Sequence, residues 1–277
     1  MGSQLLGYPQ YPQERYCKMK LTMEQYITNP IQSPILTATM RESMRSSYIK
    51  KFNAILLREH GVFNYFLYKD ETNNKYYAYF KIPSETIERF YYDTIIEFSA
   101  DQDIAEAGKN LFKYNVRFYS NDPSFVYSYA YTFNKKGLFI TDFVSKMSQK
   151  ALRDHPKEKN PGELVGYVKS IYFAYLFMKL RSFNDIDKFK AQASVLNMGN
   201  LVATVMPADQ KLGEREDAGE RLAKKKRIAR DKERRVQEAS KKKDSPLSIK
   251  YTKIVGNKPK TAGFVKTTKV TKRTKRK

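Results

Sequence analysis

The residue types that most often carry catalysis are scarce in this sequence. Its only cysteine is Cys17, and its two histidines, His60 and His155, fall in different expected elements. A structural zinc site needs about four ligands at regular spacing, so a site built from Cys and His is excluded. A single thiol also permits no intramolecular disulfide, which fits a reducing compartment.

The sequence also lacks the glycine-rich motifs that bind nucleotide phosphates and the motif that carries a catalytic serine. The sequence has neither a Gly-x-x-x-x-Gly-Lys-Ser/Thr loop nor a Gly-x-Gly-x-x-Gly turn, and it has no Gly-x-Ser-x-Gly elbow. Asp101, Asp103 and Glu106 could bind a hard cation, but they lack the glycine and the distal glutamate of a calcium loop. We therefore predict a non-enzymatic protein with no catalytic residue, metal or cofactor. A nuclease with carboxylates dispersed along the chain stays open.

The chemistry that the sequence favours most clearly is phosphate binding by residues 221–277. This segment holds 23 Lys and Arg residues against four acidic ones, a net charge of +19 out of +23, which leaves +4 for residues 1–220. Flexible lysines neutralise phosphates without reading bases. The residues expected to bind nucleic acid are Lys224, Lys225, Lys226, Arg227, Arg230, Arg234, Arg235, Lys241, Lys242, Lys243, Lys272, Arg273, Lys275, Arg276 and Lys277.

A basic segment can also be a solubilising tail or a nuclear-localisation signal. A net charge of +19 on residues 221–277, however, exceeds what solubility requires. We predict a polyanionic partner, DNA before RNA. Ribosomal RNA, anionic lipid and an acidic protein are the alternatives left open.

Charge and proline positions divide the chain into four parts. We predict an extended N-terminal arm at 1–45, a globular body at 46–198, a linker at 199–220, and a basic C-terminal arm, partly helical or disordered, at 221–277. Four prolines in the first 34 residues interrupt any helix there. The N-terminal arm is interpreted as a clasp onto another subunit.

The body has the pattern of an α+β fold, an aromatic-rich antiparallel sheet packed with helices. In the first hairpin, Tyr77 and Tyr79 are expected opposite Phe63 and Tyr65. The expected elements are a helix from Ser46 or Ser47 to His60-Gly61, strands at 62–68, 76–82, 92–98, 112–118 and 125–133, and helices from 142 to before 156, at 163–181 and at 185–196.

Residues 125–133 are interpreted as the clearest strand. Every second residue is aromatic, so five rings would line one face of the sheet. Exposed rings can stack on nucleic-acid bases. The stretch contains no Lys or Arg, however, and we therefore expect these rings in the core.

No targeting or membrane-spanning signal is recognised. The longest apolar run, Ile171–Met178, is much shorter than the ~20 residues of a spanning helix, which favours a buried helix of a soluble protein. The first residues fit neither a signal peptide nor a myristoylation site.

Three stretches resemble structural proteins of large tailed bacteriophages. They are residues 117–125 (Arg-Phe-Tyr-Ser-Asn-Asp-Pro-Ser-Phe), the Tyr-rich stretch that follows, and Asn160-Pro161-Gly162 leading into 167–180. The resemblance covers about residues 45–197 without a diagnostic motif. It implies a virion component near the portal, the neck or head-tail connector, or the inner capsid, with its basic arm against packaged DNA. It transfers no functional residue.

The sequence thus predicts a structural or assembly protein, assembled into a virion in the host cytoplasm. It would form an oligomer, contact other virion proteins through the N-terminal arm and body, bind nucleic acid through the C-terminal arm, and touch no membrane. A free DNA- or RNA-binding accessory or regulatory protein is the alternative. A nucleic-acid enzyme is the third hypothesis.

Overall fold

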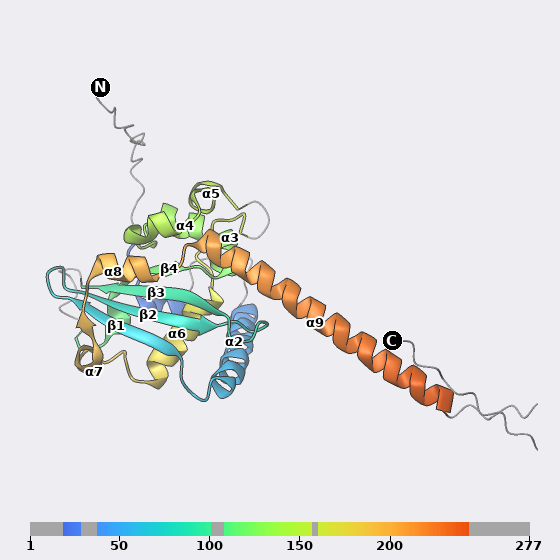
Figure 1. Cartoon of the computed structure of the whole chain (residues 1–277). Coiled ribbons are helices and arrows are strands. Elements are labelled where there is room, and N and C mark those ends of the chain that lie inside the picture. The colour runs from blue at the N-terminus through green and yellow to red at the C-terminus, as the bar shows by residue number, and fades with distance from the viewer. Residues whose placement is uncertain (1–18, 29–37, 101–107, 157–159, 244–277) are drawn as a thin grey trace, which may run out of the picture. The chain divides into compact units, whose positions relative to one another are not determined.

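The computed structural model describes residues 19–28, 38–100, 108–156 and 160–243 (Figure 1). The chain divides into two compact units, the first ending at Lys226 and the second beginning at Arg227. The buried apolar core of the described residues lies entirely in the first unit.

A five-stranded sheet forms the centre of the first unit. Its order is β4-β3-β2-β1-β5, with β1 to β4 antiparallel and β5 parallel to β1, so the sheet is mixed. Helices pack on it, which confirms the predicted α+β class. The strands are β1 (Asn64–Asp70), β2 (Lys75–Pro83), β3 (Tyr91–Ser99), β4 (Asn115–Ser120) and β5 (Ser194–Val195).

The first hairpin was predicted correctly, but its register differs. Tyr77 lies opposite Tyr68, and Tyr79 lies opposite Phe66. The turn is shorter than the expected polar loop because the Asp70 carboxylate accepts hydrogen bonds from the backbone N–H groups of Thr72 and Asn73. An aspartate that caps its own turn in this way lets the strands continue further before they separate.

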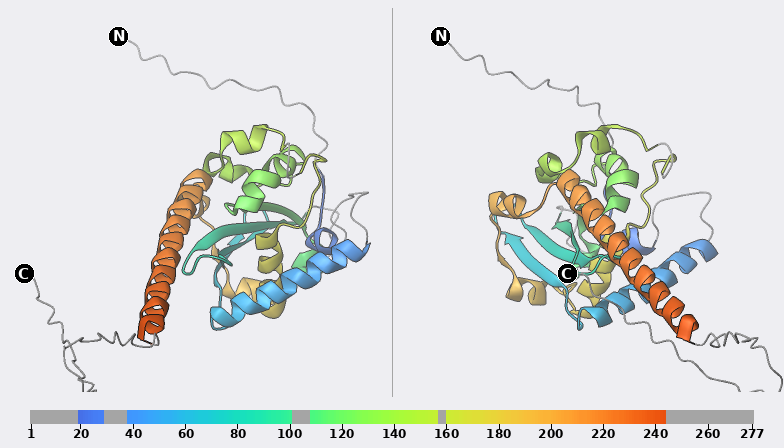
Figure 2. Two further views of the ribbon diagram at one scale, coloured as in Figure 1. Left: turned by 90° about the vertical axis from the view of Figure 1, so that its right-hand side faces the viewer. Right: turned by 45° about the vertical axis from the view of Figure 1, so that its right-hand side comes forward.

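Two helices are stacked on one face of the sheet. Helix α6 (Lys169–Leu180) contacts β2, β3 and β4, and α2 (Ala38–Arg58) packs against α6, so that α6 lies between the sheet and α2 (Figure 2). Ring contacts bind these layers together: Phe63 stacks on Phe177 with centroids 5.1 Å apart. The predicted end of α2 is confirmed, since Gly61 adopts φ +80 just beyond it.

The predicted strand at 125–133 is wrong. The stretch forms two short helices, α3 (Pro123–Ser128) and α4 (Ala130–Lys135). Asp122 caps α3 by accepting the Ser124 N–H at 2.8 Å, and Pro123 occupies the first turn. The buried Phe125 on α3 and the buried Phe133 on α4 stack on each other, with ring centroids 5.4 Å apart.

The expected N-terminal arm is mostly helical where it is described, and residues 21–27 enter the core. Helix α1 (Met23–Thr28) buries Met23, Tyr26 and Ile27, and α2 begins at Ala38 and not at Ser46 or Ser47. The Tyr26 hydroxyl donates to the Gly166 carbonyl and accepts the Val168 N–H, both at 3.0 Å. Residues 1–18 and 29–37 lie outside the described residues.

The expected linker at 199–220 is helical. It contains most of α8 (Met198–Thr204) and the first turns of α9 (Ala208–Lys243). Leu201, Val205 and Leu212 are buried there, so this stretch belongs to the folded unit.

The other predicted helices are shorter than expected. The expected helix at 163–181 begins only at Lys169, and the one at 185–196 ends at Gln192, with Asp185 as its cap. The predicted helix after residue 142 is a 3-10 turn followed by a short helix. The remaining elements, in order, are η2 (Leu111–Lys113), η3 (Thr141–Lys146), α5 (Gln149–Arg153) and α7 (Ile186–Gln192). Within the described ranges, no helix has the length and apolar character needed to cross a membrane.

Candidate nucleic-acid interface

The predicted phosphate-binding residues begin on the longest helix of the structure. Helix α9 contains 36 residues, and its sequence is rich in Ala, Glu, Lys and Arg, which have high helix propensity. The sequence predicted only a basic arm, partly helical or disordered, from residue 221. In the structure, α9 begins thirteen residues earlier, at Ala208.

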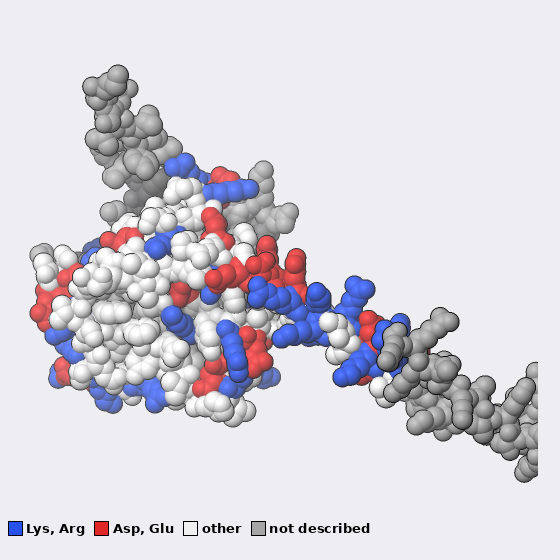
Figure 3. Space-filling model, viewed as in Figure 1, with Lys and Arg blue, Asp and Glu red and all other residues white. Residues whose placement is uncertain are grey.

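Charge is segregated along α9. Residues 208–220 carry five acidic and two basic side chains, whereas residues 221–243 carry twelve basic and three acidic ones. In the space-filling view, red gives way to blue along the helix (Figure 3). Acids near a helix N-terminus and bases near its C-terminus both complement the helix dipole, so this order favours the helix itself.

The acidic end of α9 is anchored within the first unit. Ala208 and Leu212 are buried, and the Lys211 Nζ lies 4.3 Å from the centre of the Phe90 ring. The Lys211 ammonium group also pairs with Glu214 at 3.3 Å. These contacts hold the helix to the core by its first turns, before the basic segment begins.

The basic side chains of α9 from Lys224 to Arg235 are accessible. Those of residues 223–230 are all exposed. Arg234 is flanked by two acids on its own helix, Asp231 at 4.0 Å and Glu238 at 3.7 Å. Exposed pairs at this spacing contribute only about 0.3–0.5 kcal/mol, so Arg234 can exchange them for a phosphate at little cost.

Ten of the fifteen predicted residues lie on one helix, and five lie outside the described residues; their binding to nucleic acid stays a prediction. Arg221 and Lys232 were not in the predicted set, although they lie on the same basic stretch of α9. The ten on α9 are Lys224, Lys225, Lys226, Arg227, Arg230, Arg234, Arg235, Lys241, Lys242 and Lys243. Lys272, Arg273, Lys275, Arg276 and Lys277 lie outside the described residues.

Buried carboxylates in the sheet are the main alternative site. Asp93 on β3 accepts hydrogen bonds from the Tyr79 hydroxyl at 2.7 Å, the Asn121 Nδ2 at 2.9 Å and the Met206 N–H at 3.4 Å. Burial and the neighbouring Asp93 charge raise the pKa of Tyr79 well above its usual value. A carboxylate whose oxygens are occupied by three donors orders the fold and has little capacity left for substrate.

Glu97, four residues further along β3, is arranged in the same way. Its side chain is 1% exposed, accepts from the Tyr77 hydroxyl at 3.0 Å, and lies 3.4 Å from Lys75 and 3.7 Å from Arg117. Burial first, and then the Glu97 charge, raise the pKa of Tyr77. Two cations and a hydroxyl compensate this buried charge, which also fits a structural role.

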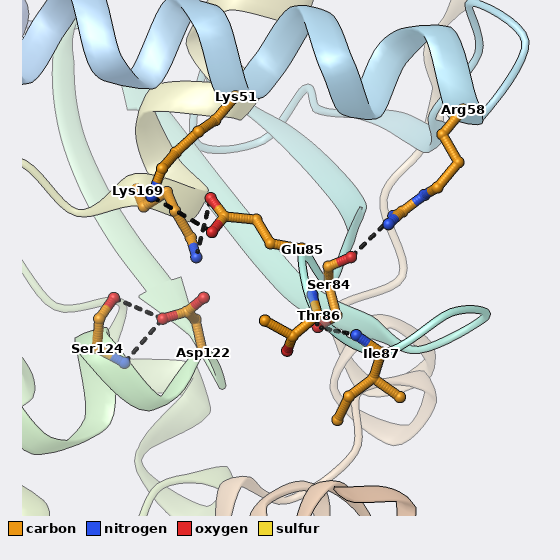
Figure 4. Close-up of polar contacts among 9 residues, drawn as sticks. All are labelled: Lys51, Arg58, Ser84, Glu85, Thr86, Ile87, Asp122, Ser124 and Lys169. Atoms are coloured by element: carbon orange, nitrogen blue, oxygen red, sulfur yellow. Dashed lines mark hydrogen bonds and ion pairs between the residues drawn. The ribbon is translucent and has the colours of Figure 1, made fainter. Parts of the chain in front are cut away.

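A third polar cluster joins α2, α6 and the segment after β2 (Figure 4). Glu85 lies 3.4 Å from both Lys51 and Lys169, so that one carboxylate forms ion pairs with ammonium groups from two different helices. Arg58 donates to the Ser84 carbonyl at 2.8 Å beside it. These contacts fix α2 to the sheet.

One pocket of about 280 Å³ lies beside α4 and α5. The rings of Tyr131 and His155 meet edge to face at its wall, and His155 Nε2 lies 3.4 Å from Glu163. A hydrogen bond from Lys135 lowers the pKa of Glu163, which therefore favours the charged form. We assign no reaction to this pocket.

Among the described residues, no three His, Cys, Asp or Glu side chains are grouped to hold a metal ion. Asp101, Asp103 and Glu106 lie outside those residues. No family model matches the chain, and neither curated proteins nor solved structures gave a match.

Proposed function

We propose that the chain is a non-enzymatic nucleic-acid-binding protein of structural or assembly type. The observation that carries this proposal is the segregation of charge: a nearly balanced segment at 1–220 against +19 at 221–277, beginning on an exposed helix. In the proposed division of roles, the first unit contacts protein partners and the basic segment neutralises phosphates.

Binding of this kind is driven by counterion release and does not depend on base sequence. If 6–10 basic residues meet phosphates, the affinity falls by roughly 10³–10⁵ between about 50 and 200 mM salt. The first unit offers no comparable excess of charge, so it would contribute little to this dependence.

A place in a virion is the more specific part of the proposal. It is supported by the resemblance of residues 117–125 and 160–180 to phage structural proteins, in which a basic segment against packaged DNA would offset phosphate repulsion. We propose that several copies assemble around or beside such DNA. Recovery of the protein in purified particles would support this placement, and recovery only in the soluble cell fraction would favour a free accessory protein.

Charge neutralisation in the intact chain tests the proposed chemistry. The variant replaces Lys224, Lys225, Lys226, Arg227 and Arg230 by Gln, and fluorescence anisotropy measures its binding to several unrelated DNA duplexes. We expect weaker binding to every duplex alike, with the salt slope reduced by about 0.9 for each lost contact. Equal binding by the variant, or loss on one sequence only, would contradict sequence-independent neutralisation.

A further inference from the structure

The five basic residues at 227–235, in the second unit, lie on two separate faces of α9. An α-helix turns by about 100° per residue, so Arg227, Arg230 and Arg234 fall within a sector of roughly 60°. Lys232 and Arg235 fall in a second sector, centred about 140° away. The five side chains are exposed. A helix resting on a flat anionic surface would need only one such face.

The two sides between these faces differ in character. On the wider side lie Ala229 and Val236, and Val236 is 65% exposed. On the narrower side lie the two acids that pair with Arg234, Asp231 and Glu238. The helix therefore has an inner side on which Ala229 and Val236 lie together with Glu233 and Gln237, an acidic outer side, and a basic face on each flank.

This arrangement matches the geometry of the major groove of B-form DNA. The groove is about 12 Å wide, and a helix with its side chains measures about 10–12 Å, so one helix fills it. Phosphates border the groove on both sides, whereas the floor presents base edges and thymine methyl groups. The flanking cations would face the phosphates, Ala229 and Val236 would face the base edges, and the acidic outer side would face away from the DNA.

We propose that residues 227–238 bind in the major groove of duplex DNA, with Arg227, Arg230 and Arg234 toward one phosphate backbone and Lys232 and Arg235 toward the other. This inference rests on the proposed function and names its substrate class as B-form duplex. Double-stranded RNA is disfavoured because its major groove is too narrow and deep to admit a helix.

Glu233 is the exception to the pattern and provides a matched test. It lies on the inner side, close to Ala229, whereas Glu238 lies on the outer side. Glu233→Gln and Glu238→Gln remove the same charge. In the groove, Glu233→Gln should tighten DNA binding several-fold more than Glu238→Gln, and equal effects would contradict a fixed orientation.

The decisive experiment compares nucleic acids of equal length and charge. The full chain is titrated with one 30-base-pair sequence as duplex DNA and as duplex RNA, and the DNA complex is probed by dimethyl sulfate, which methylates guanine N7 in the major groove. We expect about tenfold or greater preference for DNA, protection of N7, and loss of both in Ala229→Pro, which breaks the helix without changing charge. A thermal melt of that variant checks that the first unit is intact.

The outcomes separate this inference from the proposed function. Equal affinity for DNA and RNA duplexes, with N7 reactive and Ala229→Pro without effect, would overturn groove binding while leaving phosphate neutralisation in place. Failure of the full chain to bind either duplex at low salt would overturn both.

Discussion

The Tyr79 hydroxyl donates a hydrogen bond to the Asp93 carboxylate across 2.7 Å, and both side chains are buried in the sheet. Asp93 in turn accepts the Met206 N–H, which lies between α8 and α9. The acidic start of the long helix is thus connected to the centre of the sheet through one carboxylate.

Removing the Tyr79 hydroxyl should weaken the fold. In Tyr79→Phe, the buried Asp93 loses its shortest hydrogen bond, and a donor lost from a buried charged group costs about 1–3 kcal/mol. Urea unfolding measures the change. The control is Tyr65→Phe, whose hydroxyl bonds to Gln192 in an exposed position, and it should cost less than about 1 kcal/mol. Equal losses of unfolding free energy in the two variants would contradict a stabilising role of the buried Tyr79–Asp93 hydrogen bond.

The buried tyrosines make the fold sensitive to alkali. Burial raises the pKa of Tyr48 to about 12 and also raises the pKa values of Tyr26, Tyr77, Tyr79 and Tyr119. These tyrosines ionise near pH 10 in the unfolded chain but stay neutral in the folded one, so their contribution to stability is constant below about pH 10 and falls above it. Unfolding at increasing pH, followed by tyrosinate absorbance, measures this. Stability unchanged through pH 11 would contradict it.

Substitution by alanine should change the stability of the fold in opposite directions at two glycines. A Cβ at Gly166 would lie 2.8 Å from the Tyr129 hydroxyl and 2.9 Å from its ring, so Gly166→Ala should destabilise by about 1–3 kcal/mol. Gly213 lies within α9 with nothing within 4 Å of the added atom, so Gly213→Ala should stabilise by about 0.5–1 kcal/mol. Thermal unfolding compares them, and a stabilised Gly166→Ala would contradict the packing.

We expect deletions that end before residue 19 and deletions that extend beyond it to differ in their effect on stability. Deleting residues 1–18 should leave the thermal midpoint nearly unchanged. Deleting 1–34 removes the buried Met23, Tyr26 and Ile27 and should cost more than about 3 kcal/mol. If residues 1–18 act as the clasp onto another subunit, their deletion lowers the oligomeric state in sedimentation while the melt is preserved. An unchanged oligomer would contradict the clasp.

The sequence predicted elements that are determined locally. The hairpin around Asp70 follows from alternating apolar residues and a polar turn, and the end of α2 follows from Gly61. The stretch 125–133 was misassigned because its aromatic spacing satisfies a strand and a helix alike, and the cap at Asp122 decides between them. Residues 19–28 and 199–220 were misread because their burial depends on partners far away in the chain.

The candidate interface could be predicted from the sequence only in part. Net charge marks residues 221–277 from composition alone, since no packing is needed to count lysines. The start of α9 at Ala208 was not predictable, because it depends on Leu212 and Lys211 packing against the folded unit. The distribution of arginines over two helical faces becomes meaningful only once the helix is continuous.

The most direct test of the central claim is the salt dependence of DNA binding by the full chain and by a chain ending at Glu220. That cut falls beyond Leu212, the last buried apolar residue in the described part of the chain, so an unchanged melt is expected. The account predicts a steep slope of log affinity against log salt for the full chain, about −5 to −9, and almost no binding by the shortened chain. Equal affinity and equal slope for the two chains would contradict it.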